Sequence, residues 1–349
     1  MKTAGAVLPQ TLWTCLLLGC LAVCSGAPAR AQGANIPPQD PAGRDPRWGI
    51  LVAGISGDPE LQKQYVKELA DLRGILEREL GFTPSQVLVL ADDPALDPAR
   101  IRYQSTRANL ESVCRDIAGR AARDSLVFVY LQGHGDSDGK TYRLNLVGPD
   151  PTAEDLAAMI SAIPAQRTII VNATNCSGGS LEALAGKSRI VVSATKSGNE
   201  KNLTHLGRFF IDALAGNQAD VDKNGRVSVF EAFTYAARKV QEYYTREGSL
   251  QTEHPVMSDN GDEQRLTLED NAIKSSQLSR TSYLDRGSPL LAGDGSPEGQ
   301  ALAREAQSLE KQVELLKLAK DEMTEDVYLQ RLETLLLKLA EVQAKLRKK

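Results

Sequence analysis

The sequence contains residues that can supply side-chain or backbone oxygens at the spacing that a calcium-binding loop requires. They occupy positions 1, 3, 5, 7, 9 and 12 of a twelve-residue pattern, with a glycine at position 6: Asp220, Asp222, Asn224, Arg226, Ser228 and Glu231, with Gly225. Calcium prefers hard oxygen ligands, supplied here by carboxylates, an amide, a hydroxyl and the backbone carbonyl of Arg226. Gly225 permits the sharp bend. We therefore predict an EF-hand type loop that binds calcium.

The flanking sequence supports this loop. Leu206–Leu214 predicts an entering helix and Val229–Tyr244 an exiting helix. The run Ser258–Asp262 repeats part of the pattern without the distal glutamate, so we interpret it as a turn, with a second oxygen site as the alternative. Because no second complete loop accompanies the first, we expect a structural site of weak affinity rather than a sensor. The alternative is an acidic connecting loop that binds nothing.

A histidine and a cysteine each follow an apolar run. Leu126–Leu131 leads into a glycine-flanked turn at His134, and Thr168–Asn172 precedes Cys176. The carboxyl ends of parallel strands commonly carry functional sites, so the two side chains are candidates for a base and a thiol nucleophile. The two glycines after Ser177 open the next helix, whose backbone N–H groups are candidates for holding an oxyanion.

These residues need a scaffold that the rest of the pattern supplies. Continuous apolar runs predict buried strands at Trp48–Ile55, Gln86–Leu90, Leu126–Leu131, Thr168–Asn172 and Arg189–Ala194. Helical patterns fall between them at Leu61–Leu80, Thr106–Arg123 and Ala153–Ile163. This alternation is typical of an α/β fold, with a mostly parallel sheet covered by helices on both faces.

The start of the chain has the features of a secretory signal. Lys2 is followed by an apolar stretch at residues 11–24 and by a small-residue cleavage site at Ala29–Ala31. We therefore expect an exported protein, periplasmic or extracellular. The apolar run is shorter than the ~20 residues of a spanning helix, so no spanning segment is expected, although an uncleaved anchor is one alternative. A lipid-anchored form is another, because Leu17–Cys20 resembles a lipobox.

Composition divides the chain and excludes some partners. We expect a signal peptide at 1–31, a flexible linker at 32–47, the α/β domain at 48–261, a second linker at 262–300 and a helical tail at 301–349. The formal net charge of -4 argues against a nucleic acid partner. Only Cys114 and Cys176 lie beyond the expected signal peptide, so the cysteines form no disulfide framework.

The tail has coiled-coil spacing. Leucines recur every seven residues at Leu302, Leu309 and Leu316, and a second series steps by four and three at Tyr328, Leu332, Leu335, Leu339, Val342 and Leu346. Two helices of this length are marginal alone. They should fold back as a hairpin, dock on the domain or dimerise, which makes self-association or a protein partner the expected role. A solvated tail without a binding role is the alternative.

In four segments the sequence resembles the caspase-like fold of caspases, metacaspases and legumain-type peptidases. These are Trp48–Gly54, the Gln132–Gly135 turn, Asn175–Gly179 and Arg189–Thr195, and the resemblance spans 48–244. It implies a cysteine peptidase that acts on peptides or proteins. By the same resemblance His134 would be the general acid/base, Cys176 the nucleophile, and the backbone amides of Gly135 and Cys176 the oxyanion donors.

One departure from that pattern leaves two interpretations open. Aligning Ser177–Gly179 on the bacterial motif Cys-x-Ser-Gly-Gly places Asn175, not Cys176, at the nucleophile, which would make the chain an inactive calcium-binding scaffold or interaction protein. A legumain-like alignment instead restores Cys176. Four further polar residues are weaker candidates. Asp136 and Asp138 could select a basic substrate residue, or they are simple turn residues. We expect His205 and His254 to be structural.

Overall fold

The computed structural model describes residues 47–262, 265–268, 277–285, 296–320 and 323–347. Two units are distinguished, 1–39 and 40–349, and every described residue belongs to the second. The expected signal peptide and residues 32–46 lie outside the described residues. In the part that is described, no helix combines the length and the apolar character that crossing a membrane requires.

A mostly parallel sheet organises the domain. Within the described residues seven strands join in the order β3 (Tyr103–Gln104), β2 (Val87–Ala91), β1 (Arg47–Ala53), β4 (Leu126–Gln132), β7 (Arg167–Asn172), β8 (Arg189–Ser193) and β9 (Val256–Asp259). All neighbouring pairs are parallel except β8 and β9. A separate hairpin pairs β5 (Gly135–Ser137) with β6 (Tyr142–Leu144). The predicted α/β class is confirmed.

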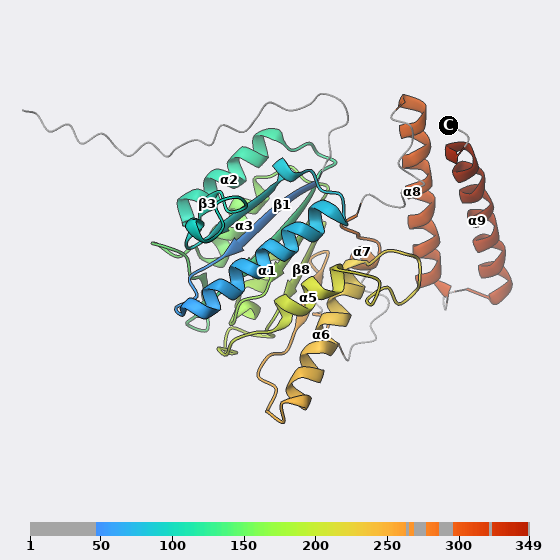
Figure 1. Cartoon of the computed structure of the whole chain (residues 1–349). Helices are drawn as coiled ribbons and strands as arrows, with labels where there is room; N and C mark the ends of the chain where they lie inside the picture. Colours follow the sequence, from blue (N-terminus) through green and yellow to red (C-terminus); the bar gives the residue numbers. More distant parts are fainter. Residues whose placement is uncertain (1–46, 263–264, 269–276, 286–295, 321–322, 348–349) are drawn as a thin grey trace, which may run out of the picture. The chain divides into compact units, whose positions relative to one another are not determined.

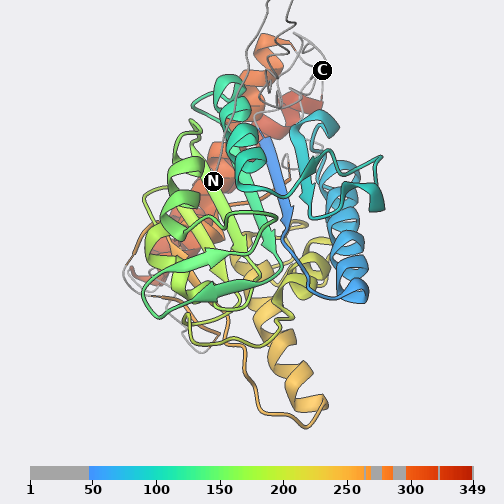
Figure 2. The same cartoon turned by 90° about the vertical axis from the view of Figure 1, so that its left-hand side faces the viewer.

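Helices cover both faces of this sheet (Figures 1 and 2). One hydrophobic cluster joins the sheet to α1 (Pro59–Arg78), α5 (Leu206–Leu214) and α6 (Val229–Arg246). A second cluster joins the other face to α2 (Arg107–Arg120), α3 (Ala153–Ser161) and α4 (Leu181–Leu184). Because both faces are covered, the central strands are mainly apolar between their ends, and every residue of β1 is buried, including Arg47 at its start.

Side-chain caps fix where several helices begin. The Asp58 carboxylate accepts the N–H of Glu60 and Leu61 at the start of α1. Thr152 forms a capping box with Asp155 at the start of α3. Short 3₁₀ turns lie at Pro84–Gln86 and Pro94–Leu96, and a third, η3, spans Ser177–Ser180. These caps satisfy backbone donors that an isolated helix leaves unpaired.

The segment expected as a second linker differs from that expectation. It contains a short helix, α7 (Gln277–Arg280), and buried residues at Leu266, Ser282 and Leu284. Leu266 also pairs with Met257 of β9, a strand that the sequence pattern did not indicate. Polar composition concealed this packing, because several of its buried side chains are Ser and Thr held by hydrogen bonds, and its buried leucines follow no periodic pattern.

The chain ends in two antiparallel helices, α8 (Pro297–Leu318) and α9 (Glu325–Arg347) (Figure 1). They pack through residues of the predicted heptad series: Leu302, Ala306, Leu309, Leu335, Leu339, Val342 and Leu346. Among the folding alternatives considered for this tail, the structure therefore shows the helical hairpin.

Candidate functional site

Two parallel strands bring the His134 and Cys176 segments to one edge of the sheet. Leu131 near the end of β4 pairs with Asn172 at the end of β7. Beyond that pair the Ala173 N–H still donates to the Leu131 carbonyl at 2.8 Å. The turns that follow β4 and β7 are therefore neighbours, as the sequence pattern predicted for the carboxyl ends of parallel strands.

His134 is held by backbone contacts on its own side of this edge. Its Nε2 lies 2.9 Å from the Ser56 carbonyl, and its own carbonyl accepts the Asn145 N–H at 3.0 Å. Gly133 has a φ of +125° and lies against Gly54, so that a Cβ at residue 133 would come within 3.1 Å of the Gly54 backbone. The glycine before the histidine is thus required by close backbone approach.

Asn175 is the side chain that reaches the His134 turn. Its Oδ1 accepts the Gly135 N–H at 2.8 Å, and its Nδ2 donates to the Lys201 carbonyl at 2.9 Å. Asn175 is 8% exposed, so both ends of its amide are used in a buried setting. The resemblance assigned the Gly135 amide to an oxyanion, and in this structure that amide donates to Asn175.

Cys176 is buried in the core. It adopts the left-handed backbone conformation, with φ 56°, and its side chain belongs to the hydrophobic cluster shared with α3 and α4. Burial raises the pKa of its thiol, with Asp136 acting in the same direction and Lys201 in the opposite one. The Cys176 N–H donates to the Glu200 carbonyl at 2.8 Å, so the second expected oxyanion donor is also in use.

Within the described residues, no hydrogen bond joins the His134 ring to the Cys176 thiol. The nearest link between their segments is Asn175, whose Nδ2 lies 3.8 Å from the Cys176 Sγ. The segments of the two expected dyad residues therefore reach one edge of the sheet, but their side chains are not hydrogen-bonded to each other.

The Ser-Gly-Gly segment after Cys176 serves a packing role. A Cβ on Gly178 would lie 2.2 Å from the Ser197 nitrogen, and the Gly178 N–H donates to Thr195 Oγ1 at 2.8 Å. Ser177 Oγ takes part in a buried network with Ser193 and Thr195. These N–H groups hold the neighbouring loop rather than an open anion site.

Three of the four remaining polar candidates have structural partners. Asp138 accepts the N–H groups of Lys140 and Thr141 in the turn after β5, and the Thr141 bond is the main cause that lowers the pKa of this carboxyl. His205 lies against Tyr243, with ring centroids 4.0 Å apart, and burial lowers its pKa. His254 Nδ1 lies 2.6 Å from Glu200 Oε1. Asp136 is exposed on β5.

A polar cavity of about 230 Å³ opens beside this edge. Its lining combines backbone around Gly178 and Gly179 with charged and hydroxyl side chains, among them Ser137, Lys140, Glu182, Asn199 and Arg265. It therefore presents hydrogen-bond donors and acceptors together with positive and negative side chains.

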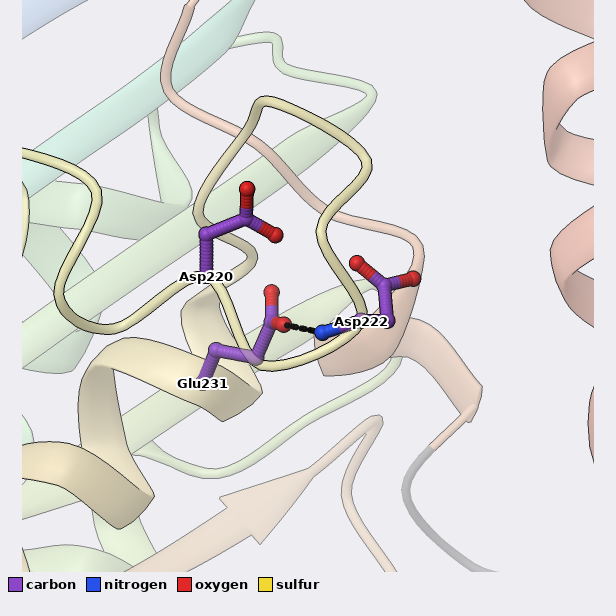
Figure 3. A group of neighbouring side chains, drawn as sticks. All are labelled: Asp220, Asp222 and Glu231. Carbon is purple, nitrogen blue, oxygen red and sulfur yellow. Dashed lines mark hydrogen bonds between the residues drawn. The ribbon is translucent and has the colours of Figure 1, made fainter.

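The second candidate site is the loop between α5 and α6. Figure 3 shows three carboxylates, Asp220, Asp222 and Glu231, turned toward a common centre, and one ligand oxygen from each lies within 4.8 Å of the others. Gly225 has a φ of +81°, as the predicted bend requires. The Asp220 carboxylate accepts the Gly225 N–H at 2.9 Å, and Glu231 Oε1 accepts the Val221 N–H at 3.0 Å.

The other predicted ligands have further roles. Ser228 and Glu231 form a capping box at the start of α6. Asn224 Oδ1 accepts the Arg226 N–H at 2.9 Å. The Arg226 guanidinium pairs with Asp285 at 2.6 Å, a link that the sequence pattern did not indicate. The donor set is all oxygen and strongly acidic, which fits calcium.

Comparison with known proteins gives a structural likeness only. No protein-family model matches the sequence, and no curated protein matches it. The structure is similar to the crystal structure of the Drosophila initiator caspase Dronc, with 12% sequence identity and a TM-score of 0.42. The likeness covers 64% of this chain and 84% of that chain.

Proposed function

We propose that this chain is an exported, calcium-stabilised caspase-like domain that binds a peptide or protein partner without cleaving it. The observation that carries the proposal is the contact between Asn175 Oδ1 and the Gly135 N–H at 2.8 Å. A peptidase of this design needs a nucleophile beside the histidine and a free amide for the oxyanion. Here the Asn175 side chain already accepts the Gly135 amide, and Cys176 is 1% exposed.

The polar cavity beside Gly178 and Gly179 is the proposed binding surface. The Lys140, Glu182 and Arg265 side chains in its lining offer charged groups of both signs, which suit the polar groups of an extended peptide. Export rests on the signal-like start of the sequence, and calcium binding rests on the three facing carboxylates of the loop. Both belong to this proposal.

Labelling with a cysteine-directed peptide electrophile tests the inactive site. In a Cys114→Ala background the folded chain should leave Cys176 unlabelled, because its thiol is buried and has a raised pKa. Moving the thiol by one residue, with Asn175→Cys and Cys176→Ala, should permit labelling beside His134. Replacing His134 by alanine in that variant should then reduce the labelling rate.

A cysteine peptidase using His134 and Cys176 is the second candidate. It is favoured by one observation, the arrival of both segments at neighbouring strand ends. Labelling of Cys176 in the folded Cys114→Ala chain, together with its loss on His134→Ala, would establish this candidate and contradict the first. Circular dichroism of each variant confirms that the fold is intact.

A further inference from the structure

Helix α9 carries apolar side chains that no described residue covers. Its inner face packs on α8 through Leu335, Leu339, Val342 and Leu346. Outside that seam four large apolar side chains are exposed, at 38%, 51%, 47% and 60% respectively: Val327, Leu329, Leu336 and Leu337. A helix that is apolar beyond one stripe is expected to be buried on more than one side.

The clustering distinguishes these residues from ordinary surface leucines. The other exposed large hydrophobics of the described chain lie singly in separate segments: Ile55, Leu96, Leu203, Val221 and Leu250. Scattered apolar residues of that kind need no partner. On α9, by contrast, four occur between positions 327 and 337 of one helix.

The charges of α9 indicate what the partner is. The first half of the helix is mainly acidic, with Glu325, Asp326 and Glu333 against Arg331, and the second half is mainly basic, with Lys338, Lys345 and Arg347 against Glu341. A second α9 placed antiparallel brings each acidic half beside a basic half, whereas a parallel copy brings like charges together. The opposed helix dipoles favour the same orientation.

Helix α8 forms ion pairs with the calcium loop. Its Glu310 lies 3.6 Å from Arg226 Nη1, and its Lys317 lies 3.6 Å from Asp222 Oδ2. Among the described residues, α9 carries exposed large hydrophobic side chains and α8 carries none, so of the two helices α9 is the one that offers an apolar surface.

We propose that α9 is a self-association surface, on which a second copy of this chain packs in antiparallel orientation. The two-fold axis passes near Leu336, the midpoint of Glu325–Arg347. Two hairpins then form a four-helix arrangement, in which the exposed leucines of each α9 are covered by the other.

Sedimentation of the whole chain, as recovered after export, tests the apolar part. The parent should be a dimer at micromolar concentration, and Leu329→Gln with Leu336→Gln should shift it to monomer. A matched control replaces two exposed leucines outside the helix, Leu96→Gln with Leu250→Gln, and should remain a dimer. A parent that is monomeric at about 10⁻⁴ M, or a dimer that survives the α9 substitutions, overturns the proposal.

Charge reversal tests the orientation. One variant changes the acidic half (Glu325→Lys, Asp326→Lys, Glu333→Lys) and a second changes the basic half (Lys338→Glu, Lys345→Glu, Arg347→Glu). Each alone should be monomeric, because its α9 carries mainly one sign of charge. Mixing the two should restore a dimer, and a mixture that stays monomeric contradicts the antiparallel pairing. Far-UV circular dichroism checks that the helices persist.

Discussion

The carboxyl group of Asp259 is buried away from water. It is 1% exposed, and burial raises its pKa to about 6, with Asp262 acting in the same direction. Oδ2 accepts the N–H and the hydroxyl of Ser279 at 3.2 and 3.1 Å, whereas Oδ1 has no hydrogen-bond partner. Arg167 and Arg280 are the nearby positive charges.

This environment predicts a stability that falls as pH rises. An unfolded Asp ionises near its ordinary value of 3.8 and the folded one near 6, so between these values the folded state binds more protons. The parent should therefore lose up to about 3 kcal/mol of unfolding free energy across that window. Asp259→Asn should remove this part of the dependence. Urea unfolding of both chains between pH 4 and pH 7, at about half-unit steps, measures the difference, and parallel curves would refute the assignment.

Asn260, next to Asp259, shows how the partial repeat of the calcium pattern is used in the fold. Its Oδ1 accepts the Ser188 N–H at 2.8 Å, and its φ is +61°. The residue works as a turn that joins β9 to the loop before β8. The turn interpretation of Ser258–Asp262 therefore holds for Asn260 and Gly261, whereas Ser258 and Asp259 belong to β9.

The calcium loop is an element that joins two helices, and calcium should stabilise that junction. The ligand oxygens of three carboxylates lie within 4.8 Å of one another, and the Lys317 ammonium, 3.6 Å from Asp222 Oδ2, leaves a net negative charge for a bound cation to neutralise. We expect the melting temperature to rise with calcium and to fall on chelation. Asp220→Asn keeps an oxygen for the Gly225 N–H but removes one charge, so it should abolish most of the calcium response. Differential scanning calorimetry with and without calcium measures both effects.

A variant at the N-cap of α6 distinguishes the stabilisation by calcium from the stabilisation by helix capping. Ser228→Ala removes the N-cap of α6 and should cost about 0.5–2 kcal/mol with or without calcium. Its melting temperature should still rise with calcium, because the three carboxylates remain. A parent that melts at one temperature in both buffers, or an Asp220→Asn chain that responds as the parent does, would count against the site.

The elements themselves were largely predictable, because burial on both faces makes their strands continuously apolar. The runs at Leu126–Leu131 and Thr168–Asn172 predicted β4 and β7, and their shared edge followed. The sequence pattern did not predict which side chain at that edge faces His134. Whether Asn175 or Cys176 faces His134 depends on a φ of 56° and on the carbonyls of Glu200 and Lys201, which long-range folding brings there.

At the scale of the whole molecule, Arg47 joins parts of the chain that are far apart in sequence. It opens β1 and is 4% exposed. Its Nη1 donates to the carbonyls of Leu80, after α1, and of Leu284, at 2.7 Å each. Its guanidinium also lies 4.5 Å from the centre of the Phe82 ring. The charged head thus holds the first strand, the end of α1 and the segment that follows α7.

That segment also reaches the calcium loop. Ser228 forms a bridge with Tyr283, and Asp285 pairs with Arg226 of the loop. Residues 283–285 therefore connect Arg47 to the calcium loop, which is far from it in the sequence. No apolar periodicity marks these residues, which is why composition assigned them to a linker.

Replacing Arg47 should disturb this whole connection. Arg47→Met keeps the stem against Phe82 but leaves the carbonyls of Leu80 and Leu284 without their donor, at a cost of about 1–3 kcal/mol for each buried group. We expect a lower unfolding free energy and faster amide hydrogen exchange at 281–285, extending into the loop at 226–228. Arg78→Met, at an exposed position at the end of α1, is the control. If exchange at 281–285 is unchanged in Arg47→Met while stability falls, Arg47 acts only on the start of the sheet, and the link to the calcium loop does not exist.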